Sequence, residues 1–366
     1  MKLIADSGLW SVGTAVAAPP AVAVVEVAGA VLEWTVDESS NAARITFTDI
    51  AAADWLWRLV GSGGHSTLVG SIGTTVAQDG LILDIADVVV APEPLAALRR
   101  LALGHWLRRW WPTSRLDGIA ALDPALLDTE VAVLTAELQE YFSEETFDSD
   151  IAGLLAPHRP ALADVVRAGD PRAIELVRAA VDLADDAGLG DWSEILERQD
   201  DSAERRRDDY ALAAGGLVAT GGDVIAHGAS TVSWTAVPPG VFDAAEGTVS
   251  WSVRWSGTAA EAHVQVATVG SAHGVPVRFE SGVIGGRGVL HRDGSATLQL
   301  VDADGQPVSE NQAWAHHWAN TLVSVGADVS EAPSARESIR ALARSRLSNP
   351  GPDSFLAEIL AGEADY

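Results

Sequence analysis

The chain has 366 residues and a formal net charge of −27 at pH 7, so its field opposes binding to a phosphate backbone, and nucleic acid is not expected as a partner. It has no cysteine, which excludes disulfides, thiolate nucleophiles, zinc fingers and iron–sulfur clusters. Its one lysine is Lys2, so no internal lysine can form a Schiff base, hold a pyridoxal cofactor or complete a phosphate-binding loop.

The first residues lack a positively charged region followed by an apolar core and a cleavage site, so no secretory signal is predicted. Residues 12–32 are apolar, but Pro19, Pro20 and Glu26 interrupt them, and a membrane span needs ~20 uninterrupted apolar residues. We therefore expect a cytoplasmic protein with no membrane contact. Arginine in place of lysine, with abundant Ala, Gly, Val and Asp, indicates a bacterial source.

Residues 1–91 are predicted to form a small β domain of short strands joined by turns. Residues 31–35 and 44–48 have the pattern of a hairpin, and residues 81–90 form an apolar run typical of a buried strand. Residues 54–60 fit a short strand or a helical turn equally well. The glycine-rich residues 61–70 are interpreted as a mobile loop, since no lysine follows to complete an anion site.

Residues 92–214 are predicted to form a helical domain. Asp123 before Pro124, and Asp170 before Pro171, each combine a side-chain acceptor at the N-cap with a preset φ at the first helical position. Apolar residues follow both at helical spacing, and further helices are expected at residues 160–168 and 192–212.

Residues 222–330 are predicted to form an antiparallel β-sandwich, which begins after a glycine-rich junction. In residues 248–255, Val249, Trp251, Val253 and Trp255 alternate with polar residues, as expected of a half-buried strand. At least four more alternating segments follow, with turn residues between them.

Residues 331–366 are predicted to form a C-terminal helical tail. Residues 334–337 read as a capping box, and residues 349–352, Asn-Pro-Gly-Pro, end the helix that it opens. A short amphipathic helix follows, and because so short a helix is marginal in water it must dock on this chain or on another. The predicted fold class is therefore α+β multidomain: a small β domain, a helical middle, a C-terminal antiparallel β-sandwich and a helical tail.

No motif predicts a catalytic, cofactor-binding or metal-binding residue. The pentapeptide Gly-x-Ser-x-Gly is missing, and Ser66 beside His65, and Ser271 near His273, are only sequence neighbours. The C-terminal domain holds six of the nine histidines, but without His-x-His or His-Glu-x-x-His spacing. The acidic residues 144–150 lack the pattern of a calcium loop, and the glycines of residues 282–288 lie between two strands, where they favour a turn or bulge.

Two segments are instead predicted to contact a partner protein. Trp and Arg are common at the centres of interfaces, and the segment around residues 99–115 is rich in both. Its arginines lie all round a helical wheel, which favours their pairing with acidic neighbours and leaves the partner-facing surface as the alternative reading. The tail after Pro352 has one apolar face suited to a groove. The candidate partner-binding residues are Arg108, Trp110, Trp111, Phe355, Leu356, Ile359 and Leu360.

The leading functional hypothesis is a non-enzymatic interaction or scaffold (adaptor) component of a bacterial multiprotein system. A first alternative is an enzyme, or a protein that binds a small ligand or metal, using the histidine-rich C-terminal domain. A second is a structural protein that assembles with copies of itself through an exposed sheet edge, and a homo-oligomer is compatible with each.

Overall fold

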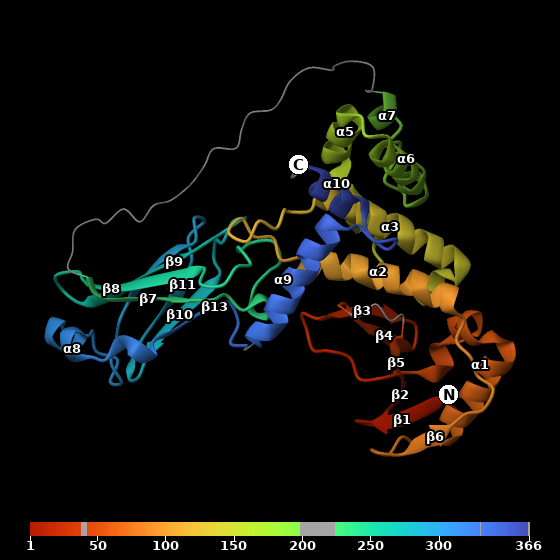
Figure 1. Cartoon of the computed structure of the whole chain (residues 1–366), viewed down its shortest axis with the longest axis horizontal. Helices are drawn as coiled ribbons and strands as arrows, with labels where there is room; N and C mark the ends of the chain where they lie inside the picture. The colour runs from red at the N-terminus through yellow and green to blue at the C-terminus, as the bar shows by residue number, and fades with distance from the viewer. Residues whose placement is uncertain (38–41, 198–223, 330, 365–366) are drawn as a thin grey trace. The chain divides into compact units, whose positions relative to one another are not determined.

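The computed structural model describes residues 1–37, 42–197, 224–329 and 331–364 of a mixed α and β protein (Figure 1). It has an N-terminal antiparallel sheet, helices in the middle of the chain, C-terminal antiparallel sheets and a helical tail, which confirms the predicted fold class. The chain folds into two compact units. Unit 1 comprises Met1–Trp110, Leu122–Ala203 and Ala341–Tyr366, and unit 2 comprises Trp111–Ala121 and Glu204–Arg340.

Unit 1 contains a six-stranded antiparallel sheet in the order β3-β4-β5-β2-β1-β6, so β3 and β6 are its two edge strands. The predicted hairpin of residues 31–35 and 44–48 is confirmed as the pairing of β4 with β5. The strands are β1 (Lys2–Asp6), β2 (Leu9–Val12), β3 (Val22–Val27), β4 (Ala30–Thr35), β5 (Arg44–Phe47) and β6 (Ile82–Asp84).

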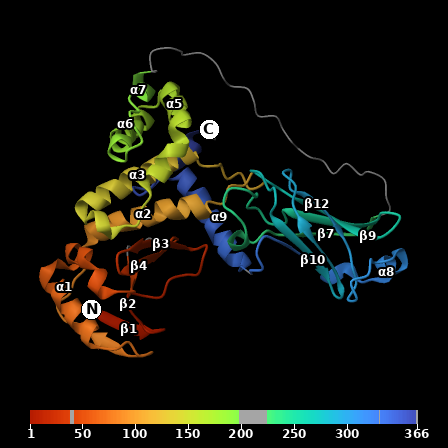
Figure 2. The same ribbon diagram turned by 180° about the vertical axis from the view of Figure 1, so that it is seen from behind.

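Alternation along the strands gives this sheet one buried face. Val25 and Val27 of β3 are buried together with Leu32 and Trp34 of β4, while Glu26 between them is exposed. Helix α2 packs on β3 and lies along the sheet, as Figure 1 and Figure 2 show from opposite sides. The apolar face of the sheet thus holds α2 in place.

Seven helices and two tail helices are described in the chain outside the sandwich, together with short 3-10 turns. The Asp-Pro helix starts are confirmed, because Asp123 accepts from the N–H groups of Ala125 and Leu126, and Asp170 does the same for Arg172 and Ala173. The helices are α1 (Trp57–Thr74), α2 (Pro92–Trp110), α3 (Pro124–Tyr141), α4 (Ile151–Leu155), α5 (Arg159–Ala168), α6 (Pro171–Asp186), α7 (Glu194–Glu197), α9 (Pro333–Ser348, across which the division between units falls) and α10 (Leu356–Ala364).

Two predictions for unit 1 were wrong. Residues 61–70 are helical within α1, with Gly61 (φ 73°, ψ 162°) breaking the helix geometry, and the Ser and Thr hydroxyls of this segment donate to carbonyls one turn earlier. Residues 81–90 form no buried strand, since β6 has three residues and Ile82 is 58% exposed. Of the helix expected at residues 192–212, α7 is described and residues 198–212 lie outside the described residues.

Unit 2 holds two antiparallel sheets, β12-β9-β8-β7 and β11-β10-β13, whose buried residues form one hydrophobic core. This arrangement confirms the predicted sandwich. The strands are β7 (Val224–Ser230), β8 (Val249–Trp255), β9 (Ala260–Val266), β10 (Pro276–Ser281), β11 (Ile284–Val289), β12 (Ser295–Gln299) and β13 (Leu322–Val325), and a short helix, α8, spans Glu310–Ala315.

The predicted alternation in β8 is confirmed, with Val249, Trp251 and Val253 buried and Trp255 half-buried. The Trp251 ring fills the space beside Gly228 of β7, where an added Cβ would lie 2.5 Å from the ring. Any larger residue at position 228 would therefore clash with the core.

Among the described residues, no helix combines the length and apolarity that a membrane crossing requires.

Candidate functional site

The strongest candidate site in unit 1 is the open edge of strand β3. In an antiparallel pair, alternate residues exchange both backbone hydrogen bonds with the residue opposite. The β3–β4 hairpin turns through Ala28 and Gly29, so the pair Val27 and Ala30 closes it and Val25 is the next residue to bond to β4. The N–H of Ala28 points the other way and donates to the Thr146 carbonyl over 2.8 Å.

The same parity directs the N–H and carbonyl groups of Val24 and Glu26 away from β4 and toward the free edge. Within residues 1–37, 42–197, 224–329 and 331–364, no hydrogen bond to these outward groups is present. β3 therefore offers an unpaired backbone edge about 7 Å long between these two residues, at ~3.3 Å per residue.

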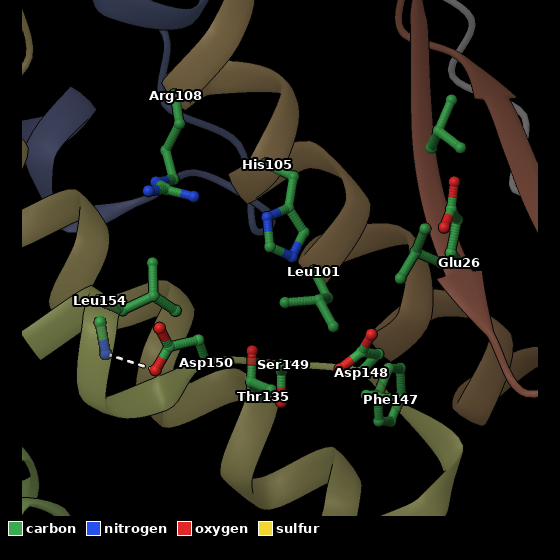
Figure 3. A pocket seen from close by; sticks show the side chains of 13 residues that line it. Glu26, Leu101, His105, Arg108, Thr135, Phe147, Asp148, Ser149, Asp150 and Leu154 are labelled. Atoms are coloured by element: carbon green, nitrogen blue, oxygen red, sulfur yellow. Dashed lines mark hydrogen bonds between the residues drawn. The ribbon is translucent and has the colours of Figure 1, made fainter.

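A cavity of about 470 Å³ lies along this edge, and we name it the edge groove. Residues 147–150, which follow the Thr146 carbonyl bonded to Ala28, form the far wall of the groove, and α2 supplies the floor (Figure 3). The lining residues are Val24, Val25, Glu26, Leu101, His105, Arg108, Thr135, Phe147, Asp148, Ser149, Asp150, Gly153 and Leu154.

His105 of α2 points into the edge groove, one helical turn after Leu101 (Figure 3). Burial and the neighbouring Arg108 cation lower the pKa of His105 to about 4, although Asp128 acts in the opposite direction. The imidazole is therefore neutral at pH 7, and it offers one donor and one acceptor nitrogen to a bound molecule.

Three carboxylates surround the edge groove: Glu26 on the β3 side, and Asp148 and Asp150 on the opposite wall (Figure 3). Asp150 accepts from the Gly153 N–H over 2.7 Å and so caps α4. None of the three forms an ion pair with another residue in the described part of the chain.

Arg108, the cation of the groove, is already neutralised. Its Nε lies 2.5 Å from Asp128 Oδ1, and the other oxygen of Asp128 lies 2.9 Å from His158 Nε2. With Arg108 paired and His105 neutral, the groove presents unpaired negative charge.

The apolar face of the tail, predicted to bind a partner, is instead packed on its own unit. Phe355 and Ala357 are 0% and 1% exposed, Leu356 is 9% exposed, and Ile359 and Leu360 are half-buried. Helix α10 packs on α3. A partner could reach Phe355 and Leu356 only by displacing the tail.

Two buried carboxylates hold the tail: Glu358 joins α9 to α10, and Glu130 joins α10 to α3. Glu358, 0% exposed, accepts from Arg346 Nε at 2.6 Å and from the Phe355 N–H at 2.9 Å. Glu130 of α3 accepts from the Leu356 N–H at 2.7 Å and from Arg100 at 2.6 Å.

The structure does not gather the Trp- and Arg-rich residues into one surface. Arg108 pairs with Asp128, and the Arg109 guanidinium lies 4.0 Å from the centre of the half-buried Trp110 ring. Trp111 belongs to unit 2, where its Nε1 donates to the Ala120 carbonyl over 2.8 Å. Arg99, Arg100 and Arg108 of α2 pair with acidic neighbours, as the favoured reading of this segment expects.

The histidines of unit 2 do not converge on one point. No group of three or more His, Asp or Glu side chains with metal-binding geometry is found among the residues that the structure describes. His316 Nε2 lies 2.9 Å from the Ser281 hydroxyl, which also accepts from Thr321. Ser281 is only 1% exposed, and in the described structure no carboxylate orients His316, so the pair lacks the access and the third group of a nucleophilic site.

Sequence reasoning identified neither the edge groove nor His105. The acidic residues 144–150 were visible as a motif, and residues 22–27 lie in a region predicted to form short strands. That β3 is an edge strand beside them follows only from the order of the sheet, which no local pattern encodes.

No family model, no curated protein and no solved structure matches this chain.

Proposed function

We propose that this protein is a non-enzymatic interaction protein that binds an extended segment of a partner polypeptide in the edge groove. The segment adds to the sheet as a strand beside β3. The observation that carries the proposal is the outward-facing backbone of Val24 and Glu26, which lacks partners among the described residues and lines a cavity.

Strand addition suits this arrangement because main-chain hydrogen bonds supply affinity while pockets select alternate side chains. Proteins usually protect an open edge by covering it or keeping it short, since it can pair with any extended chain. In unit 1 the bond from Ala28 to Thr146 covers the end of β3, and the edge then remains open beside Val24 and Glu26.

The backbone edge can be tested with the substitution Val24→Pro. Proline removes the outward N–H and leaves the β3–β4 bonds of neighbouring residues intact, which is why proline is tolerated on edge strands. The control is Val24→Thr, which keeps the N–H and the β-branched shape. Circular dichroism of both variants verifies that the sheet is retained.

The ligand probe is a displayed library of random decapeptides, selected on the full chain. We expect selected peptides to bind the unaltered chain and the Val24→Thr variant, and to lose at least tenfold in affinity for Val24→Pro, because a lost backbone bond leaves a partner group unpaired. Selected peptides that bind all three proteins equally contradict strand addition at β3. A selection that yields no peptide contradicts the proposed function itself.

The same edge could pair with β3 of a second copy, which is the self-assembly alternative. Light scattering distinguishes self-assembly from binding of a partner, because self-assembly through β3 gives a dimer that Val24→Pro dissociates. A monomer that binds peptides supports the partner-binding function.

A further inference from the structure

We propose, resting on the proposed function, that the partner segment is basic, with Lys or Arg at alternate positions and small uncharged residues between them.

Side chains of a strand beside β3 alternate between two faces. One face looks onto α2 and α3, where it meets Leu101 and His105 of α2 and the buried Thr135 of α3. The Thr135 hydroxyl already donates to the Val131 carbonyl over 2.7 Å, so His105 is the polar group left to bond on this floor. Small residues that can form one hydrogen bond, such as Thr or Ser, fit this face.

The other face of the added strand lies beside the exposed Glu26 side chain on β3. Across the cavity, Asp148 and Asp150 present two further carboxylates (Figure 3). A long cationic side chain at every second position reaches these groups, whereas an acidic side chain is repelled by all three. Complementary charge of this kind sets partner choice more than raw affinity.

Among the described residues that line the groove, Arg108 is the cation, and its charge is already paired. Arg108 is held by Asp128, and the neutral imidazole of His105 adds none at pH 7. The chain as a whole is also strongly acidic, so a basic segment is steered toward it from a distance.

The size of the preference for a cationic peptide can be calculated from three partly exposed ion pairs. Each contributes ~0.2–1 kcal/mol, so a cationic peptide that forms all three should bind about 3- to 150-fold more tightly than a neutral one of the same shape. The preference should shrink with added salt, because exposed charges are screened over ~10 Å at 0.1 M ionic strength.

The experiment measures fluorescence anisotropy of three labelled octapeptides, in which Thr alternates with Lys, Gln or Glu. We expect the Lys peptide to bind the full chain most tightly and the Glu peptide most weakly. In the double variant Glu26→Gln, Asp148→Asn the Lys peptide should lose about fivefold in affinity. The control variant, Glu175→Gln on α6, changes a charge outside the groove lining and should leave binding unchanged.

The outcomes separate this inference from the proposed function. Equal binding of the Lys and Gln peptides, both weakened by Val24→Pro, overturns the basic preference and leaves strand addition standing. Equal loss in the double variant and in Glu175→Gln also overturns it, because the effect then comes from net charge alone. If Val24→Pro changes the binding of none of the three peptides, strand addition at β3 fails as well.

Discussion

At the scale of single residues, the most consequential group in unit 1 is the carboxylate of Glu358. It is fully buried, and it bonds two nitrogens of the Arg346 guanidinium, at 2.6 and 2.8 Å, and one backbone N–H. A buried ion pair is not by itself strongly stabilising, but removal of one partner leaves the other charge buried and uncompensated. Glu358 therefore joins the two tail helices, α9 and α10, to each other.

The substitution Glu358→Ala is expected to lower the free energy of unfolding of unit 1 by about 3–5 kcal/mol, because Arg346 loses its buried partner. Urea denaturation of the full chain measures this loss. The control is Glu363→Ala, which removes the exposed carboxylate that pairs with Arg172. Similar losses in the two variants would contradict a buried role for Glu358.

Glu246 of unit 2 gives a pH-dependent prediction. Burial acts to raise its pKa, but hydrogen bonds from Arg336, Thr231 and Arg340 outweigh it and lower the pKa to about 2. Because the folded pKa lies below the unfolded value of 4.5, the group stabilises the fold above pH 4.5, and this contribution is lost as pH falls toward 2.

Accordingly, Glu246→Gln should destabilise unit 2 by about 1 kcal/mol at pH 7, a figure reduced for solvent screening of this partly exposed side chain. The difference from the unaltered chain should narrow as pH falls from 5 to 3. Thermal unfolding at several pH values tests this, with Glu280→Gln as the control. A difference that stays constant over this range would rule out the ion pairs as its cause.

The residues that sequence predicted correctly are those whose role is local. Asp123 and Asp170 cap helices through N–H groups two and three residues away, so the sequence contains both partners. Whether Phe355 is buried depends on contacts with residues more than 200 positions away, such as Gly104. An apolar helix face predicts that something covers it, and only the tertiary fold says what.

At the scale of elements, close packing of α2, α3 and the tail depends on Gly104. A Cβ added there would lie 2.6 Å from Val131 Cγ2 and 2.8 Å from Phe355 Cζ. Alanine favours a helix by ~1 kcal/mol over glycine, but an overpacked core costs ~1–3 kcal/mol. The cost of overpacking therefore exceeds the gain in helix propensity, and alanine at position 104 should destabilise the fold.

We expect Gly104→Ala to lower the free energy of unfolding by about 1–2 kcal/mol. The control is Gly70→Ala in α1, where a Cβ meets no atom within 4 Å and stability should rise by up to about 1 kcal/mol. Chemical denaturation of both variants provides the comparison. An increase in stability for both would mean that α2 and the tail are less closely packed than the structure shows.

Element type was predictable where periodicity and caps agreed, as in α3, α6 and β8. The prediction for residues 61–70 was wrong because glycine, serine and threonine are poor helix formers. Helix α1 forms there although the helix propensity of its residues is low. The prediction of a buried strand at residues 81–90 was wrong because an apolar run indicates a strand without showing whether that strand is buried.

At the scale of the whole molecule, the last part of the chain is a structural component of unit 1. A chain that ends at Asn349 loses Phe355, Leu356 and Glu358, and so uncovers Val131 and Gly104 and leaves Arg346 without Glu358. We expect such a chain to bind the dye ANS and to lose cooperative unfolding of unit 1. A chain that ends at Glu363 retains these residues and should behave like the full chain.

If the chain ending at Asn349 unfolds with the same midpoint as the full chain, the tail contributes nothing to the fold. That result would return the tail to the role of a docking segment for a partner.

Strand addition at β3 can be observed by hydrogen–deuterium exchange of the full chain with and without the tightest decapeptide selected from the library. We expect slower exchange of the Val24 and Glu26 amides on binding, and no change at the opposite edge strand β6. Unchanged exchange in β3, with protection confined to other parts of the chain, would contradict strand addition in the edge groove.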